Sequence, residues 1–517
     1  MLRRNGIRFP LVRLLQNLRT GAMKYLLLTG ATGLVGRYLL RDLLAEDVPV
    51  AVLVRSTRFE SAAQRIEAIM ERWEQLAGRC LPRPVVLEAD LREPLLGLAE
   101  GSRRWIAENC DRVLHNAASM VFREDKHGEP FRTNVDGMRN MLAVCQEMGL
   151  RRFHHVSTAY VCGLRNGRVF ENELDLGQEN GNVYEVSKLA AEKLLRAADF
   201  LDPPSVYRPA SVAGDSLTGY TTSTHGFYLP LQLAYIMADK VPTALMGEHY
   251  FKLLGLEGNE GKNLVPVDWL SAAIVHLVTH PQYHGQTYHL TNPEPVTVSL
   301  IQQVISEAIE KFSTKRFVGE LTAEEIASYD ELFRHYMEIY RSHWRDDPKF
   351  DRTNTDRALA TLPCPVIDHD MLLRIAGYPV KHNFALKRSE PSQAGWQPQE
   401  HLERLVGGEP HSHTHVGGGN AHDPAATTVG LQVTGSGGGQ WRLVVRDGNI
   451  VGLELGLGPA DRARYYLNSS TFSSLVQGRC SVEQSISSGR IVIEGSDSAG
   501  GGDQDFVRIL ETIVSAT

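Results

Sequence analysis

Long apolar runs are absent from this chain of 517 residues: no segment approaches the roughly 20 apolar residues needed to span a bilayer. An excess of positive charge is absent too. The net charge is −7 and no zinc-finger or aromatic-basic motif is present, which disfavours nucleic acid as a partner. The six cysteines have no CxxC spacing and follow no signal peptide, so we expect reduced thiols and a cytoplasmic protein.

Clusters of metal ligands are equally scarce. Four histidines gather in the segment EPHSHTHVGGGNAHD, but a flexible Gly-rich stretch makes a poor preorganised site. We therefore predict that the chain holds no functional metal. These histidines are His411, His413, His415 and His422.

The length of the chain predicts two or three domains, because single hydrophobic cores stop growing below this size. Residues 1–22 are a basic extension with five arginines, no acid and leucines at helical spacing. We expect this extension either to touch an anionic membrane surface peripherally or to precede a true start near Met23. The remaining chain is expected to form an α/β domain over 23–384, a flexible His- and Gly-rich linker over 385–426 and an α+β domain over 427–517.

Apolar runs suited to buried strands alternate with helical patterns between Lys24 and about Phe170. The runs are YLLLTG, VPVAVLVR, PVVLEAD, RVLHNAA and RFHHVST. Strands separated by helices predict right-handed βαβ units, and hence a Rossmann-like, doubly wound parallel sheet covered on both faces. From about 170 to 384 the pattern is less regular, which predicts a smaller substrate cap.

A glycine-rich turn, TGATGLVG, follows the first predicted strand and precedes the helical run RYLLRDLLAE. Glycines allow a tight turn and a close approach of a pyrophosphate to main-chain N–H groups, while the helix N-terminus favours negative charge. The sequence therefore predicts a dinucleotide site at this turn. Its expected members are Gly30, Thr32, Gly33, Leu34, Val35 and Gly36.

The end of the second strand indicates which dinucleotide is bound. An acidic residue would hold free ribose hydroxyls, but Arg55 stands at this position, and a guanidinium pairs with a 2′-phosphate. We therefore expect NADPH as the cofactor, with Arg65 as a second basic group near the phosphate. The other residues expected around the adenosine half are Asp90, Leu91, Asn116, Ala117 and Ala118.

Tyr184 and Lys188 stand four residues apart in VYEVSKLAAEKLL, on one face of a predicted helix. A neighbouring ammonium favours the phenolate of a tyrosine and can also hold ribose hydroxyls, which suits proton exchange. Thr158, at the end of the fifth strand in HVSTAYVCG, is expected beside Tyr184 and the substrate oxygen. These three residues are the predicted catalytic set.

These motifs resemble those of the extended short-chain dehydrogenase/reductases, and most closely the thioester reductases and the fatty acyl-CoA reductases of the male-sterility type. The matching segments are TGATGLVGRYLL, ADLREPLLGL, HNAASMVF, TNVDGMRNML, FHHVSTAYVCG, VYEVSKLAAEKLL, YRPASVAGD and NLVPVDWLSAAIV. The resemblance covers about Lys24 to Phe384 and implies the same fold, cofactor and catalytic residues. It also implies that the cofactor is lined by Asn116, Asn134, Pro209, Ala210, Ser211 and Val212.

The C-terminal segment resembles sterol carrier protein 2 domains, through Trp441, Asp461, Phe472 and the run GRIVIEG. Such domains enclose an apolar tunnel for an acyl chain or a sterol. Their leading helix is either missing here or supplied by EHLERLVGG. Lipid binding and a structural or dimerising role are both open for this segment.

The leading hypothesis is NADPH-dependent reduction of a hydrophobic acyl thioester, bound to a carrier or to CoA, to an aldehyde or alcohol. We recognise no adenylation or carrier domain in the chain, so the thioester is expected from elsewhere, with an acyl carrier protein as one partner. A first alternative is an NADP-dependent ketone or hydroxyl oxidoreductase acting on a lipid or polyketide. A second alternative is a non-catalytic, cofactor-sensing lipid-binding protein, against which the predicted catalytic set argues.

Overall fold

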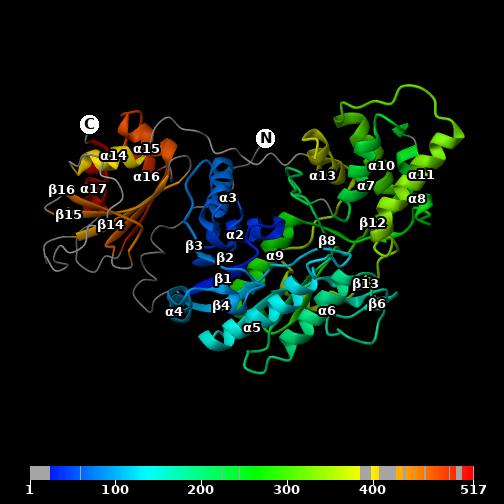
Figure 1. Cartoon of the computed structure of the whole chain (residues 1–517), viewed down its shortest axis with the longest axis horizontal. Helices are drawn as coiled ribbons and strands as arrows, with labels where there is room; N and C mark the ends of the chain where they lie inside the picture. Colours follow the sequence, from blue (N-terminus) through cyan, green and yellow to red (C-terminus); the bar gives the residue numbers. More distant parts are fainter. Residues whose placement is uncertain are drawn as a thin grey trace. The chain divides into compact units, whose positions relative to one another are not determined.

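The computed structural model describes residues 24–58, 60–223, 225–243, 245–384, 398–406, 427–434, 438–446, 449–458, 461–487, 490–495 and 503–515. These residues fall into two compact units (Figure 1), which are described separately. The larger unit comprises 24–62 and 85–386. The smaller unit takes 63–84 and the chain from 387 onward.

A seven-stranded sheet forms the centre of the larger unit. Its strands are β1 (Tyr25–Thr29), β2 (Val50–Val54), β3 (Val85–Glu88), β4 (Cys110–His115), β5 (Arg152–Val156), β7 (Ser205–Pro209) and β11 (Thr287–Leu290). Their order is β11-β7-β5-β4-β1-β2-β3, and every pairing is parallel. The predicted Rossmann-like, doubly wound sheet is therefore confirmed.

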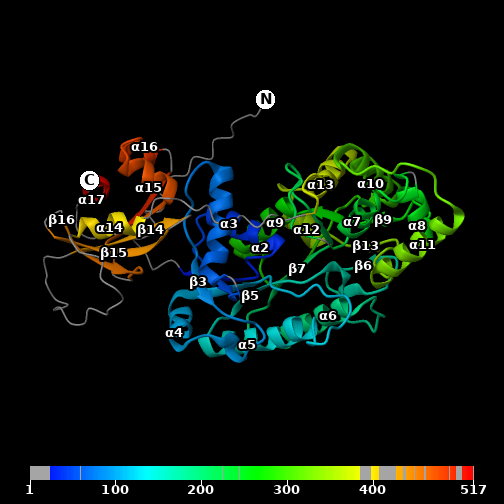
Figure 2. The same cartoon turned by 45° about the horizontal axis from the view of Figure 1, so that its top comes forward.

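Helices cover both faces of this sheet (Figures 1 and 2). One face carries α2 (Leu34–Ala45) and α9 (Val267–Thr279), and the other carries α4 (Glu100–Asn109), α5 (Gly137–Met148) and α6 (Val183–Arg196). Leu27, Val113 and Phe153 of the strands pack with Met141 and Leu195 of the second helix layer. Burying each such side chain stabilises the packing of helices on the sheet by roughly 1.5–3 kcal/mol.

The expected cap region has a hydrophobic core of its own, in which Leu231, Ile305 and Leu372 are fully buried. Within it α10 packs against α7 and α13. The helices here are α7 (Tyr228–Met237), η4 (Leu245–His249), α8 (Tyr250–Leu253), α10 (Val298–Phe312), α11 (Ala323–Met337), η6 (Glu338–Tyr340) and α13 (His369–Lys381). Outside this core, η5 (Pro281–Tyr283) packs on α9 and α12 (Thr353–Ala358) packs on β11.

Short elements connect the sheet to the cap. Three two-stranded pairs are β6 (Arg168–Val169) with β13 (Lys349–Phe350), β8 (Ser211–Ala213) with β10 (Leu264–Pro266), and β9 (Gly261–Lys262) with β12 (Val296–Thr297). Three short helical turns are η1 (Pro94–Gly97), the π-helical η2 (Arg132–Asp136) and η3 (Ala159–Cys162).

A five-stranded mixed sheet forms the smaller unit, in the order β16-β15-β14-β17-β18. Only β14 and β17 pair in parallel. The strands are β14 (Thr427–Thr434), β15 (Gly439–Arg446), β16 (Asn449–Leu455), β17 (Ala463–Asn468) and β18 (Ile491–Gly495). The helices are α14 (Pro398–Leu405), α15 (Ser469–Val476), α16 (Val482–Ser487) and α17 (Asp503–Ser515).

The smaller unit also contains residues 63–84, which include most of α3 (Ala62–Ala77) and lie between β2 and β3 in the sequence. Cys80 packs into the core of the C-terminal sheet, and its Sγ donates to the carbonyl of Arg490 at 2.9 Å. The Thr434 hydroxyl lies 3.5 Å from a carboxylate oxygen of Glu74. This arrangement differs from the expected division, in which 23–384 is one domain and 427–517 another.

The expected linker over 385–426 is not structureless throughout, because α14 (Pro398–Leu405) forms within it. Leu402 of this helix is fully buried in the core of the C-terminal sheet. The residues EHLERL thus form part of a helix of this unit. That this helix is the leading helix of a sterol-carrier-like domain stays a prediction. The basic extension over 1–22 and the four linker histidines lie outside the described residues. No helix among the described residues is long and apolar enough to cross a membrane.

Candidate active site

The predicted site residues of the larger unit gather at one edge of the main sheet. Because all seven strands are parallel, the turns after β1, β2, β3, β4, β5 and β7 meet at their carboxyl ends, where an open α/β sheet binds its ligands. Arg65 is the exception, since it lies on the part of α3 that belongs to the smaller unit. Its proximity to a cofactor remains a prediction.

The glycine turn between β1 and α2 requires its glycines at two positions. Gly30 has φ +75°, and a Cβ on it would lie 2.7 Å from the main-chain nitrogen of Ala117. A Cβ on Gly36 would lie only 2.0 Å from the carbonyl oxygen of Gly30, so the helix could not approach the strand. These contacts match the roles expected of such glycines in a dinucleotide-binding turn.

The start of α2 suits a phosphate group. Gly33 is the N-cap, and no side chain caps the helix. A Cβ on Gly33 would come no nearer than 3.5 Å to another atom, so the space beside it is open to a ligand. Leu34 and Val35 then supply amides of the first turn, which contains no acidic residue. The Thr32 carbonyl accepts from Arg37 Nε at 3.0 Å, which holds the turn in place. An uncapped helix N-terminus of this kind fits a pyrophosphate.

Two arginines lie near Asp90 at the ends of β2 and β3. Arg92 makes a bidentate ion pair with the Asp90 carboxylate, with its closest contact at 2.6 Å. The Arg92 hydrogen bond, opposed by partial burial and aided by the charge of Arg55, lowers the pKa of Asp90. The neighbouring Leu91 carbonyl accepts from Asn140 Nδ2 at 2.8 Å, which anchors this turn on α5.

The turn after β4 packs directly on the glycine turn. The amides of Asn116 and Ala117 both donate to Thr29 Oγ1 at 3.1 Å, and Asn116 Nδ2 donates to the Gly30 carbonyl at 3.3 Å. Ala118 follows in the same extended stretch. The short side chains at 117 and 118 leave the carboxyl edge of β4 uncovered by bulky groups.

Asn134 clamps this turn to the helix that carries the predicted catalytic residues. It lies on the π-helical turn η2 and is buried. Its Oδ1 accepts from the Ser119 amide at 2.7 Å, and its Nδ2 donates to the Ser119 carbonyl and to Ser187 Oγ, both at 2.9 Å. Asn134 is therefore placed to order both sides of the site.

Thr158, Tyr184 and Lys188 come together as the sequence predicts. Thr158 follows β5, and its side chain lies close enough to the Tyr184 hydroxyl to oppose the rise in the pKa of that phenol. Lys188 lies one turn further along α6, and its Nζ donates to the Val156 carbonyl at 2.8 Å. The structure thus places a hydroxyl, a phenol and an ammonium side by side at the carboxyl end of β5.

Burial dominates the ionisation of these groups. Reinforced by the charge of Glu185 and opposed by the Thr158 side chain, it raises the pKa of Tyr184 well above its usual value. The expected shift toward phenolate beside Lys188 stays a prediction for the protein with cofactor bound. Burial lowers the pKa of Lys188 to about 8, against the opposing charge of Glu192. Tyr184 is thus a protonated donor at neutral pH.

The helix α6 is fixed by an ion-pair network one turn beyond Lys188. The Glu192 carboxylate is fully buried and pairs with Arg208 at 2.6 Å and Arg196 at 2.8 Å. It also accepts from Ser157 Oγ at 2.8 Å. Since Ser157 precedes Thr158, this network fixes both partners of the catalytic set.

An aromatic wall lies beside Tyr184, which we define as Phe122, His225 and Tyr340. The ring of Phe122 stacks on Tyr184 with centroids 5.7 Å apart and meets Tyr340 at 4.9 Å. His225 Nδ1 lies 3.2 Å from the Tyr340 hydroxyl. All three residues are half-buried. The sequence does not predict these three residues, because they come from three separate loops and turns and share no motif.

The chain after β7 runs into the cap through Pro209, Ala210, Ser211 and Val212. Pro209 is the last residue of β7, and the Ala210 amide donates to the Leu290 carbonyl at 3.3 Å. The Ser211 amide donates to Asn263, and β8 then pairs with β10. This stretch therefore borders the carboxyl edge as the resemblance implies.

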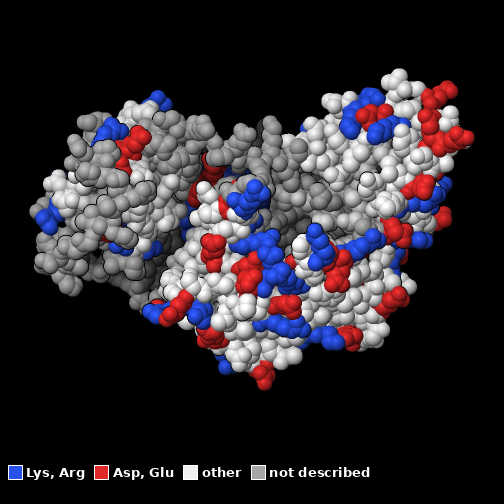
Figure 3. Space-filling view, viewed as in Figure 1, with Lys and Arg blue, Asp and Glu red and all other residues white. Residues whose placement is uncertain are grey.

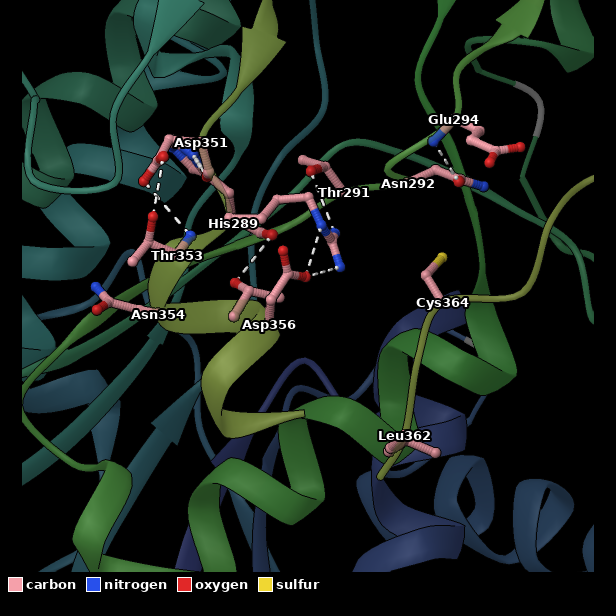
Figure 4. Close-up of polar contacts among 12 residues, drawn as sticks. His289, Thr291, Asn292, Glu294, Asp351, Thr353, Asn354, Asp356, Leu362 and Cys364 are labelled. Carbon is pink, nitrogen blue, oxygen red and sulfur yellow. Dashed lines mark hydrogen bonds and ion pairs between the residues drawn. The ribbon is translucent and has the colours of Figure 1, made fainter. Parts of the chain in front are cut away.

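Polar contacts hold the segment after the last strand (Figure 4). His289 Nδ1 lies 2.8 Å from the Asp351 carbonyl, and the His289 carbonyl accepts from Thr355 at 3.1 Å. The side chains of Thr353 and Asp356 point into the same group of contacts. These bonds fix the return of the chain from the cap to the sheet.

A parallel doubly wound sheet with a glycine turn after β1 and a threonine, tyrosine and lysine set at β5 and α6 defines a short-chain dehydrogenase/reductase. Residues 28–274 match the sequence profile of the family described as male sterility protein. This segment is thus an NAD(P)-binding short-chain dehydrogenase/reductase domain of the male-sterility type.

Curated relatives have longer chains. Nonribosomal peptide synthetase asaC of Aspergillus flavus is 27% identical over 282 residues, covering 52% of this chain and 26% of that protein. Aldehyde reductase lnaA of the same organism is 26% identical over 409 residues, covering 70% of this chain and 37% of that protein. This chain therefore matches between 26% and 37% of the length of these relatives.

A solved structure of similar fold is the terminal R domain from the myxalamid PKS-NRPS biosynthetic pathway. It is 28% identical, and the alignment covers 71% of this chain and 93% of that domain with a TM-score of 0.55. About seven tenths of this chain is thus similar in fold to nearly the whole of that R domain.

Proposed function

We propose that the chain is an NADPH-dependent oxidoreductase that reduces a hydrophobic acyl thioester, bound to a carrier protein or to CoA, to an aldehyde or alcohol. The observation that carries the proposal is the placement of Thr158 beside Tyr184, one helical turn from Lys188, at the carboxyl edge beside the glycine turn. A protein that only binds a cofactor has no need of a half-buried proton donor at this place.

The chemistry divides among three side chains. Tyr184 stays protonated at neutral pH and can give its proton to the carbonyl oxygen. Thr158 holds the phenol and stabilises the charge that develops on this oxygen. Lys188 remains largely an ammonium at pH 7 and is placed to hold ribose hydroxyls. When bound, NADPH would supply the hydride to the carbonyl carbon. Cleavage of the carbon–sulfur bond then releases a thiol and leaves the aldehyde.

The choice of NADPH rests on the basic end of β2 and β3. Arg55 is exposed at the end of β2, and Arg92 lies close by on the far side of Asp90. Two guanidinium groups at this edge favour a 2′-phosphate over free hydroxyls. The Asp90 carboxylate after β3 is engaged by Arg92 and so is not free to hold an NAD ribose.

The choice of a hydrophobic acyl substrate rests on the aromatic wall of Phe122, His225 and Tyr340. Aromatic rings next to the proton donor bury apolar groups and exclude water from the reacting carbonyl. The relatives whose names include peptide synthetase and R domain support a carrier-bound thioester. We further propose that the smaller unit holds the lipid-like part of the substrate and that the protein acts in the cytoplasm.

Figure 3 shows basic and acidic side chains interspersed over the described residues of one face. A carrier protein would therefore dock through local pairs of charges. A broad field of one sign is not needed for such contacts.

The test is consumption of NADPH by the full chain against acyl-CoA, acyl-carrier, aldehyde and ketone substrates, with free thiol measured in parallel. Release of one thiol for each equivalent of NADPH in the first step identifies thioester reduction. Tyr184→Phe is the matched control, because it keeps the ring and removes the proton. Turnover of ketones alone would refute the proposal and support the ketone oxidoreductase. Binding of NADPH with no turnover would support the non-catalytic alternative.

A further inference from the structure

A row of three polar side chains crosses the apolar core of the main sheet just before its carboxyl edge. Thr29, His115 and His155 are direct cross-strand partners on β1, β4 and β5. Each is only 1% exposed. Burying such groups costs stability unless they are partnered, so their placement needs an explanation. The residues two positions earlier on the same strands are the core residues Leu27, Val113 and Phe153.

One end of the row holds the turn after β4. Thr29 Oγ1 accepts from the amides of Asn116 and Ala117, both at 3.1 Å. Because these two bonds use both lone pairs, the Thr29 hydroxyl proton must point at His115 Nδ1, 3.0 Å away. His115 Nδ1 is therefore an acceptor, and the ring is neutral with its proton on Nε2.

The other end of the row meets Lys188. The rings of His115 and His155 stack with centroids 5.6 Å apart. His155 Nε2 then lies 3.5 Å from Lys188 Nζ. An ammonium has no lone pair, so His155 Nε2 is the acceptor of this long hydrogen bond. Together with the Val156 carbonyl, it directs two of the three ammonium protons and leaves one for a ligand.

We infer that Thr29, His115 and His155 are positioning residues that hold the Asn116–Ala117 turn and the Lys188 ammonium in one register. The inference rests on the proposed function only in taking both ends of the row to contact the dinucleotide. The row crosses three neighbouring strands, so a shift at either end would require the others to move. It therefore joins the phosphate side of the site to its catalytic side.

The charge state of the row suits this role. Burial lowers the pKa of His115 to about 3 and that of His155 well below its usual value, with the charge of Lys188 adding to both effects. The groups that face Lys188 are His155 and the Val156 carbonyl from β5, His115 from β4, and Glu192 of its own helix. Since both histidines are neutral, His155 offers Lys188 a hydrogen-bond acceptor, and neither ring adds a second positive charge beside the ammonium.

Two substitutions distinguish the role of His155 Nε2 as a hydrogen-bond acceptor from the role of the ring in packing. His155→Met removes the acceptor at similar volume, whereas His155→Gln places an amide oxygen near the position of Nε2. His154 is the matched control, because it is equally buried but points to the opposite face of the sheet. There its Nδ1 lies 2.8 Å from the Tyr207 hydroxyl. His154→Met therefore disturbs the same strand without touching Lys188.

The measurement is NADPH binding to the full chain by fluorescence titration between about pH 6 and 9, without acyl substrate. We expect His155→Met to raise the Kd for NADPH about tenfold. Affinity should also fall at a lower pH than in the wild type, because Lys188 loses its proton more readily without this acceptor. His155→Gln should stay within about threefold of the wild type, and His154→Met within about twofold despite a lower Tm. Equal Kd values for the two methionine variants, or equal loss for His155→Gln and His155→Met, would overturn the inference.

If His155→Met does not fold, Thr29→Val tests the other end of the row. This variant keeps the shape of the side chain and removes the acceptor of two amides, so the Kd should rise without a displacement along the pH axis. An unchanged Kd would overturn the inference. A wild-type chain that binds NADPH but reduces no thioester would refute the proposed function and leave the positioning row intact.

Discussion

Replacing Glu192 by Gln should destabilise the larger unit strongly, because it leaves the Arg208 guanidinium buried without a compensating charge. The Arg208 side chain is 1% exposed and pairs with Glu192 at 2.6 Å. Breaking one partner of a buried ion pair costs about 3–5 kcal/mol. The larger unit has about 340 residues. With an unfolding entropy of about 2.1 cal/mol/K per residue, this loss lowers Tm by about 4–7 °C.

Scanning calorimetry of the full chain measures this effect, and the transition that NADPH shifts upward belongs to the larger unit. The double variant Glu192→Leu with Arg208→Met is the control, since it removes both charges and should recover most of the lost stability. Burial raises the pKa of the Glu192 carboxyl, but the charges and hydrogen bonds of Arg208 and Arg196 together outweigh burial and hold this pKa below its usual 4.5. Its stabilising effect is therefore full above pH 4.5 and declines as the pH falls further.

Glu192→Gln and the wild type should accordingly converge in Tm at acid pH, whereas the double variant has no buried ion pair to lose and should not follow them. A Tm for Glu192→Gln within about 1 °C of the wild type at pH 7 would refute the reasoning, as would a double variant no better than the single one.

Four further predictions follow from the described geometry. Tyr184→Phe should lower turnover about a hundredfold while NADPH still binds, and wild-type rates would remove Tyr184 from the mechanism. Since the pKa of Lys188 is about 8, kcat/KM for reduction should decline as the pH rises through 8, and a flat profile from pH 7 to 9 would contradict an ammonium role. Arg55→Asp should shift the ratio of Kd values from NADPH toward NADH, whereas an unchanged ratio would assign the phosphate to another basic group. Burial raises the pKa of the Cys80 thiol to about 12, so it should resist iodoacetamide in the full chain and react once residues from 387 onward are removed, with Cys80→Ser as the control. Equal labelling of both forms would argue against its burial in the smaller unit.

The parts of the fold that the sequence predicts well are those set by local periodicity. Apolar runs separated by amphipathic helices predict the parallel sheet, because each strand is buried on both faces. The glycine turn from Gly30 to Gly36 is also predicted from local sequence, because only glycines allow its close approaches. Tyr184 and Lys188 are predicted in the same way, because their spacing places them on one face of a helix. The place of Thr158 in the site can also be predicted, because parallel strands have their carboxyl ends at one edge of the sheet.

The positioning row of Thr29, His115 and His155 could not be predicted from the sequence, although each of the three is a polar residue that adjoins an apolar one in a predicted strand. The pair His154 and His155 stands in an apolar strand, but only the register shows that His155 faces α6 and aligns with His115 and Thr29. The aromatic wall and the membership of residues 63–84 in the smaller unit depend on contacts between distant parts of the chain. No periodicity reports such contacts.

The composition of the smaller unit has a consequence for biosynthesis. About 300 residues separate Pro84 from Lys387, so α3 leaves the ribosome long before the sheet on which Cys80 packs. At about 5–20 residues per second, the helix waits roughly 15–60 s for its partners. Throughout this interval the main sheet must form while the segment between β2 and β3 still lacks the C-terminal residues against which it packs. The nascent chain therefore needs protection of this one segment, and slow translation beyond Leu386 should lower the yield of folded protein more than slow translation at earlier positions.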